Sequence, residues 1–270
     1  DHAPRDLTAH EQRVYDIYRD IIAFRTAAGH GQMDDMVAYL TGRLAAAGFA
    51  EEDLLVTDFD SDGDPTQGLV VRYRGDGSAG AKPIVMLAHM DVVDALPEDW
   101  ERDPFTLVED EGYFFGRGTQ DNKYGVANLT GPFIQLKEEG WLPNRDLYLV
   151  FSGDEETGMV STRAQARWVA ENVDPAYILN SDAFPAPDAI SRLLAHLRTN
   201  PQAGFAGSHI HGPEGDPHVT AFRFPSILSE LEGAARFGPI SRLLARHRVP
   251  LDLPEQAQRV DWLAGAAMLM

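Results

Sequence analysis

Three short stretches of the sequence combine acidic side chains, and in one case a histidine, at spacings that suit metal chemistry. The first is His89-Met-Asp91, in which a neutral imidazole can bind a metal ion while the carboxylate accepts its second N–H. On an extended backbone the two side chains point the same way. Taken alone, this pair is also typical of an ordinary hydrogen-bonded pair at a surface or in a core.

The second stretch, Gly116-Arg-Gly-Thr-Gln-Asp-Asn-Lys123, places Asp121 behind two glycines and ahead of a helical pattern. Glycine allows the backbone to approach a ligand closely. The two oxygens of one carboxylate can bridge two metal ions roughly 3.5–4 Å apart, the separation used in two-metal hydrolysis. The alternative is a glycine-rich turn in which Asp121 caps the helix.

The third stretch, Asp154-Glu155-Glu156, follows a strongly apolar run. Neighbouring carboxylates repel one another, and this repulsion raises their pKa values unless a cation lies between them. One of them could bind a metal while its neighbour takes a proton from water; an acidic loop facing solvent is the alternative. Asp182 follows another short apolar run, and by itself it is typical of a helix or turn cap.

The elements that must position these residues follow from the hydrophobic periodicity. Strands alternating with helices predict an α/β domain with a mostly parallel central sheet flanked by helices. Ligands of such sheets bind beyond the carboxyl ends of the strands, where His89, Glu155-Glu156 and Asp182 all lie. The predicted helices are 9–26, 33–47, 124–139, 162–171, 190–197 and 227–247, the last interrupted at Gly238-Pro239, and the predicted strands are 69–73, 84–88, 147–151 and 177–179.

The composition excludes several classes of function. The 270 residues include no cysteine, so any metal must be bound by His, Asp and Glu. The 42 acidic residues outweigh the 23 Lys and Arg and give a net charge of −19. We therefore expect no binding to nucleic acid or to an anionic membrane surface. Because the chain begins with Asp1, we expect a processed product or a fragment, and a cytoplasmic, periplasmic or secreted location is equally compatible with the sequence.

Taken together and in this order, the motifs resemble the co-catalytic zinc exopeptidases and amidohydrolases. This family includes glutamate carboxypeptidase, aminoacylase, acetylornithine deacetylase and succinyl-diaminopimelate desuccinylase, and the resemblance covers residues 10 to 183. The segments that carry it are Met86-Leu-Ala-His-Met-Asp-Val-Val93, Trp100-Glu-Arg-Asp-Pro-Phe105, Gly112-Tyr-Phe-Phe-Gly-Arg-Gly-Thr-Gln-Asp-Asn-Lys123 and Phe151-Ser-Gly-Asp-Glu-Glu-Thr-Gly158.

The resemblance implies two zinc ions as cofactors, with cobalt or manganese as substitutes. It implies that Asp121 bridges both ions, that His89 and Asp182 bind one of them, and that Glu156 binds the other. A cis peptide bond between Asp121 and Asn122 is implied as well.

The resemblance also implies the reaction, which is cleavage of a peptide or N-acyl amide bond next to a free carboxylate. Glu155 is the implied general base, and Asp91 is the implied partner that orients His89. The implied substrate is a small peptide or an N-acyl amino acid.

After Asp182 the sequence departs from this family. Relatives insert an α+β lid and then return to the catalytic domain with one more histidine ligand, for which residues 183–270 look too few. We predict a catalytic domain over 1–183 and an incomplete or shortened lid, with a dimerisation-like character, over 184–270. His211, ahead of Gly212-Pro213, is a further candidate for the last zinc ligand, and an exposed polar loop is the alternative.

Two other functions fit the same residues. A catalytically impaired or truncated relative could act as a metal-binding or interaction module; the shortened C-terminal part favours it. The presence of Glu155, which is needed only for proton transfer, disfavours it. A hydrolase of another fold with a single metal ion would require that Asp121 does not bridge.

Overall fold

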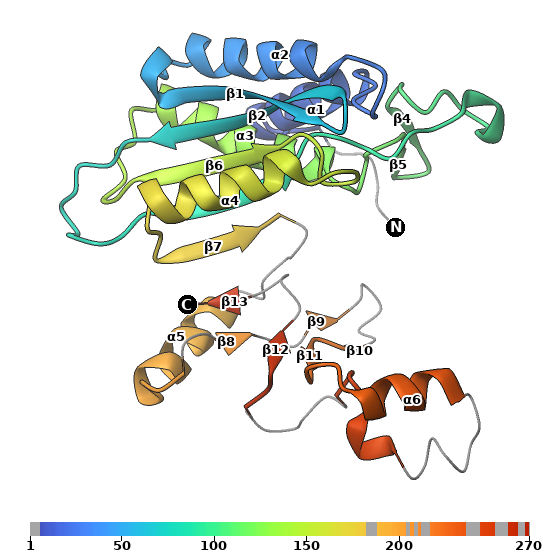
Figure 1. Cartoon of the computed structure of the whole chain (residues 1–270). Helices are drawn as coiled ribbons and strands as arrows, with labels where there is room; N and C mark the ends of the chain where they lie inside the picture. Colours follow the sequence, from blue (N-terminus) through green and yellow to red (C-terminus); the bar gives the residue numbers. More distant parts are fainter. Residues whose placement is uncertain are drawn as a thin grey trace. The chain divides into compact units, whose positions relative to one another are not determined.

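In the computed structural model one α/β unit contains the predicted site residues His89, Asp91, Asp121, Glu155 and Glu156 (Figure 1). Among the residues it describes, no helix combines the length and apolar character needed to cross a bilayer. The described residues are 6–181, 188–203, 206–207, 210–211, 217–235, 244–251, 259–263 and 268–269.

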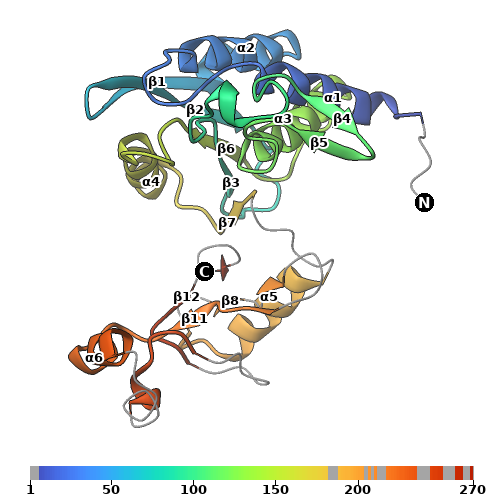
Figure 2. The same cartoon turned by 90° about the vertical axis from the view of Figure 1, so that its right-hand side faces the viewer.

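A five-stranded sheet with the order β1-β2-β6-β3-β7 forms the centre of this unit (Figure 2). β3 pairs in parallel with both β6 and β7, whereas β2 runs antiparallel to β1 and to β6. Every strand except β2 therefore runs in the same direction, and the predicted mostly parallel sheet is confirmed. The strands are β1 Leu54–Ser61, β2 Asp64–Tyr73, β3 Ile84–His89, β6 Leu147–Ser152 and β7 Tyr177–Asn180, with β4 Val108–Asp110 and β5 Tyr113–Phe115 as a separate hairpin.

Helices cover both faces of the sheet, with α1, α2 and α3 on one face and α4 on the other (Figure 2). Because side chains alternate along a strand, the buried β6 serves both layers. Leu149 and Phe151 pack with the first group of helices, and Tyr148 and Val150 pack under α4. The helices are α1 Ala9–Ile22, α2 Met33–Ala46, α3 Lys123–Glu138 and α4 Val160–Asn172, with 3-10 turns η1 Glu51–Asp53 and η2 Pro97–Asp99.

The first helix is shorter than the periodicity predicts. A helix over 9–26 is expected, but α1 ends at Ile22 and the chain turns away. The apolar spacing extends to Phe24, which is half-buried in a loop rather than in a helix. Thr26 in this loop is buried, and its hydroxyl donates to the carbonyl of Met90. The loop therefore packs against the end of β3.

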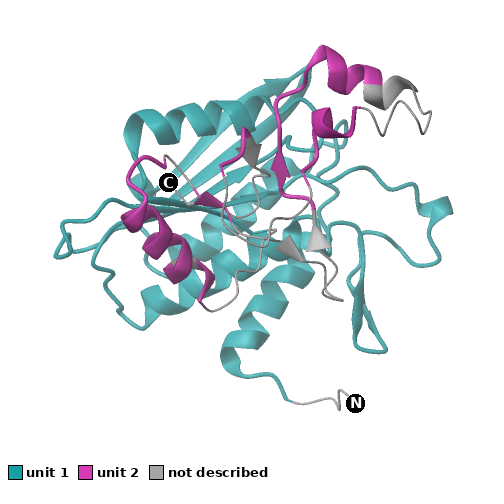
Figure 3. Ribbon diagram, turned by 90° about the horizontal axis from the view of Figure 1, so that it is seen from below, with its two compact units in different colours: residues 1–182 teal, residues 183–270 magenta. Residues whose placement is uncertain are grey.

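Residues 1–182 form one compact unit and residues 183–270 a second (Figure 3). In the second unit the predicted helix 190–197 is confirmed within α5 Ala189–Thr199. The predicted helix 227–247 is seen as α6 Ile227–Ala235 and a 3-10 turn, η3 Ala245–His247, while Gly238-Pro239 lies outside the described residues. The remaining strands form antiparallel pairs: β8 Ala206–Gly207 with β13 Met268–Leu269, β9 Ile210–His211 with β10 Pro217–His218, and β11 Ala221–Phe222 with β12 Trp262–Leu263.

The close approach of α1 to α3 depends on Gly131. A Cβ at this buried position would lie 2.5 Å from Cγ2 of Val14 on α1. We expect Gly131→Ala to lower the free energy of unfolding by roughly 1–3 kcal/mol, the usual cost of overpacking a core. Gly42→Ala on α2 is the matched control, since a Cβ there meets nothing within 4 Å. The control should raise the free energy of unfolding by about 0.5–1 kcal/mol, and urea unfolding of both variants measures the difference.

Candidate metal centre

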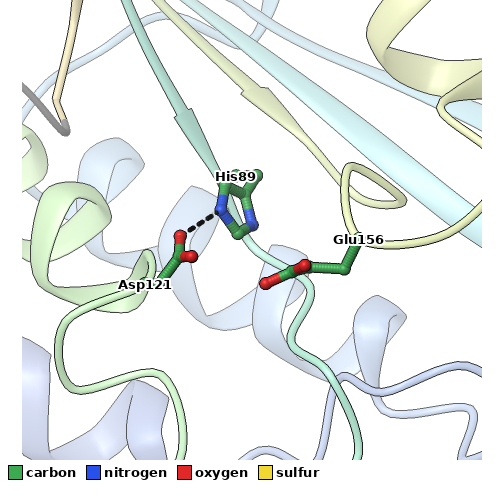
Figure 4. Close-up of side chains that lie close together, drawn as sticks. All are labelled: His89, Asp121 and Glu156. Atoms are coloured by element: carbon green, nitrogen blue, oxygen red, sulfur yellow. Dashed lines mark hydrogen bonds and ion pairs between the residues drawn. The ribbon is translucent and has the colours of Figure 1, made fainter. Parts of the chain in front are cut away.

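Three of the predicted metal ligands lie together at the carboxyl end of the sheet (Figure 4). His89 is the last residue of β3, Glu156 lies in the loop after β6, and Asp121 directly precedes Asn122 and α3. One ligand atom from each lies within 4.8 Å of the others. Ligands around a single zinc ion lie within about 4 Å of one another, because each bond is about 2.0–2.2 Å long. Small side-chain adjustments are therefore enough to surround a cation.

The ring of His89 is held on both of its nitrogens. Its Nε2 lies 2.7 Å from Oδ1 of Asp121, and its Nδ1 lies 3.0 Å from the carbonyl oxygen of Asp91 and 3.3 Å from Oδ1 of that residue. Asp91 is only 3% exposed, and its Oδ2 accepts the backbone N–H of Glu156 at 2.9 Å. One buried carboxylate thus links the ends of β3 and β6, and it leaves Nε2 of His89 directed at the cluster.

The negative charges in this cluster shift two pKa values. Burial alone would lower the pKa of His89, but the hydrogen bonds and charges of Asp91 and Asp121 outweigh it and raise the pKa to about 9. Burial raises the pKa of Glu156, and the charges of Asp121, Glu155 and Asp91 raise it further against the opposing effect of His89. The predicted crowding of carboxylates is therefore present at Glu156.

Asp154, the first residue of the acidic stretch, has a different environment from its neighbours. Its side chain is buried and accepts hydrogen bonds from the hydroxyls of Ser61 and Ser161 and from the backbone N–H groups of Val160 and Ser161. Burial opposes its ionisation, yet these hydrogen bonds hold its pKa below the ordinary value. Asp154 therefore stabilises the first turn of α4. Glu155 and Glu156 are left as the carboxylates of this stretch that could bind a metal or transfer a proton.

Asp121 is fixed from its C-terminal side. The predicted cis peptide bond between Asp121 and Asn122 is confirmed. The hydroxyl of Ser181, after β7, donates to Oδ1 of Asn122 at 3.0 Å, and a side chain at Gly125 would overlap with both atoms. The end of β7 is therefore close to the Asp121 loop.

The remaining predicted site residues are less fully defined. Glu155 is half-buried beside Glu156. Asp182 lies outside the described residues, although its neighbour Ser181 reaches Asn122. For His211 only the backbone in β9 is described.

Two buried residues near the site are absent from the predicted set. Lys123 is fully buried, which lowers its pKa to about 7 against the opposing charge of Asp91, and Thr26 binds the Met90 carbonyl. Lys123 stands in the Gly116–Lys123 stretch, but only its burial reveals it. No signal in the sequence marks Thr26.

Residues 85–220, half of the chain, match the peptidase family M20/M25/M40. The match begins within β3, includes β6, and contains His89, Asp121 and Glu156. The chain belongs to this family. The resemblance to zinc exopeptidases and amidohydrolases is thereby confirmed at the level of this hydrolase family, and the metal-ligand cluster agrees with a metal-dependent member of M20/M25/M40.

Individual curated relatives match over shorter stretches. The human N-fatty-acyl-amino acid synthase/hydrolase PM20D1 is 34% identical over 110 residues, which are 40% of this chain and 22% of the relative. A probable succinyl-diaminopimelate desuccinylase of Staphylococcus aureus is 43% identical over 89 residues, 32% of this chain and 21% of the relative. The matched part thus spans less than a quarter of each of these two proteins.

Solved structures show the same fold. The crystal structure of human carnosine dipeptidase 1 superposes with a TM-score of 0.54 at 19% identity, over 63% of this chain and 38% of the dipeptidase. At this identity the similarity concerns the fold.

The pKa of His89 predicts how the stability of the metal-free protein depends on pH. Its folded-state pKa of about 9 lies above the ordinary 6.5, so the folded state binds this proton more tightly than the unfolded state does. The resulting stabilisation is complete below pH 6.5 and is lost as the pH rises through 9. Thermal melts in chelator from pH 6 to 10 should show this loss. Asp91→Asn removes the main cause of the raised pKa and should flatten the curve in this window; parallel curves for both proteins would contradict the assignment.

Proposed function

We propose that this chain is a two-zinc hydrolase that cleaves a peptide or N-acyl amide bond next to a free carboxylate. The observation that carries the proposal is the convergence of His89, Asp121 and Glu156 at one edge of an M20-family sheet. The names of the two curated relatives, a hydrolase of N-fatty-acyl amino acids and a desuccinylase, support hydrolysis of an N-acyl amide. We propose a small peptide or N-acyl amino acid as substrate, without nucleic-acid or membrane partners, and a homodimer stays a prediction.

The donor atoms suit zinc, and cobalt and manganese as substitutes. One imidazole and several carboxylates, without a thiolate, form a nitrogen and oxygen set that such dications accept. The side chain of Asp121 is 64% exposed, and its Oδ1 lies 2.7 Å from Nε2 of His89, so this carboxylate can be reached by a metal ion at the cluster. In the proposed arrangement His89 and Asp182 bind one ion, Glu156 binds the other, and Asp121 binds both.

Glu155 and Asp91 have different roles in the proposed reaction. Two bound dications would polarise the scissile carbonyl and lower the pKa of water in the site to about 7. Glu155 takes a proton from the attacking water and passes it to the leaving nitrogen, so that the carbon–nitrogen bond breaks to a carboxylic acid and an amine. Asp91 keeps Nδ1 of His89 directed towards itself, which leaves Nε2 for the metal.

Replacing Glu155 tests the proposed general base. Glu155→Gln keeps the size of the side chain but cannot accept the proton, so kcat on N-acyl amino acids and dipeptides should fall by about 10²- to 10⁴-fold. Zinc content should stay that of the wild type, because this residue binds no metal in the proposal. Glu171→Gln, an exposed position on α4, is the control and should keep full activity. A wild type that binds zinc but hydrolyses no member of either class would instead identify the alternative metal-binding module.

Counting metal ions tests the bridging role of Asp121. Elemental analysis of zinc-loaded protein should give two ions per chain, and Asp121→Ala should reduce the content of both sites. Chelation should lower the melting temperature, since ligands that bind only the folded state stabilise it by mass action. A single ion per chain, or equal melting temperatures with and without zinc, would contradict the two-metal proposal.

A further inference from the structure

The segment between α1 and α2, residues 23–32, contacts the residue that joins the metal ligand to its orienting carboxylate. Met90 stands between His89 and Asp91 and is fully buried. Its backbone N–H donates to the carbonyl of Ser152 at 2.8 Å, and its own carbonyl accepts the hydroxyl of Thr26 at 2.7 Å. Both polar groups of this residue's backbone are therefore fixed, one by β6 and the other by the 23–32 segment.

A second set of contacts holds the same segment to the residues after Asp91. Arg25 donates to both carboxylate oxygens of Asp94, at 2.8 and 2.9 Å, and to the carbonyl of Ala95 at 3.3 Å. Nε2 of His30 lies 3.2 Å from Oδ2 of Asp94. The segment thus binds the loop on both sides of Asp91.

Lys123 ties this segment to the start of α3. Its Nζ donates to the carbonyl of Phe24, and the charge of Asp91 lies within electrostatic reach. Among the buried side chains that the structure describes, it is the only lysine or arginine. The aliphatic part of the Lys123 side chain packs against Gly118, where an added Cβ would lie 3.1 Å from the Lys123 Cδ. Burial of an amine is costly unless it is paired, so this position indicates an interaction that an apolar side chain could not make.

We propose that Lys123 and Thr26 are positioning residues of the metal centre. Lys123 holds the 23–32 segment through Phe24, and Thr26 fixes the Met90 carbonyl, so that Asp91 keeps Nε2 of His89 directed at the metal. Neither residue belongs to the cluster of ligand atoms. The inference rests on the proposed metal site and adds the residues that keep it in shape.

Metal affinity is the readout that separates positioning from general stabilisation. Thr26→Val keeps the shape of the side chain without its donor, and Lys123→Met keeps the length without the amine. Each should weaken zinc binding about tenfold, the low end for residues that support metal ligands, and should reduce the rise in melting temperature caused by zinc. Competition with a chromophoric chelator measures the affinity of each variant.

Two matched controls remove the same groups elsewhere. Thr41→Val deletes a hydroxyl that donates to the Val37 carbonyl on α2, and Lys82→Met deletes an exposed amine paired with Asp174. Both should bind zinc as the wild type does. A Thr26→Val protein that melts lower than the wild type both with and without zinc, yet binds zinc with unchanged affinity, would overturn the proposal.

A double variant that combines Thr26→Val with Lys123→Met tests whether the two residues act together. Because both residues act through the same segment, the combined loss of affinity should be smaller than the product of the single losses, whereas independent effects would multiply. If Lys123→Met fails to fold, Thr26→Val alone still decides the result. A wild type that binds no zinc would overturn the proposed function itself, whereas zinc-binding variants with wild-type affinity would overturn only the positioning roles.

Discussion

Several carboxylates meet around a buried histidine at the carboxyl end of the central sheet, and like charges at this range repel one another. Burial raises the pKa of Glu156 and the neighbouring carboxylates raise it further, while the carboxylates of Asp91 and Asp121 attract a proton to His89 and raise its pKa. A fold that brings such groups together loses free energy unless a cation compensates the charge. Metal binding therefore has to be considered as part of the folding energetics of this unit.

The sheet creates this crowding through the pairing of β3 with β6. The two strands are parallel neighbours, and His89 pairs with Ser152 in register, so the loops that follow both strands leave the sheet at the same point. Asp91 in one loop accepts the backbone N–H of Glu156 in the other. Backbone pairing thus brings the loops that carry His89 and Glu156 together, and side-chain contacts hold these loops in place.

The buried strands can be predicted because short, continuous apolar runs such as 84–88 and 147–151 are typical of strands covered on both faces. The periodicity does not predict β1, because this strand is largely exposed and half of its eight residues are polar. At the site, the sequence shows the ligand types and their order, and the resemblance supplies the role of each. Thr26 and Lys123 cannot be found in this way, because their partners lie 64 and 99 residues away, and only the folded chain brings them together.

Residue type alone does not assign a role to the acidic residues of this site. Asp154 has its oxygens occupied by donors from the first turn of α4, Asp91 is shared between His89 and Glu156, and Asp121 is left largely exposed. Each carboxylate is thus committed to a different task by the donors around it. Closed structural zinc sites have four protein ligands, whereas catalytic sites keep a position open. Glu155 lies beside Glu156 and is not one of the three clustered side chains, so a carboxylate that can accept a proton stands next to the cluster, which favours chemistry over a purely structural metal.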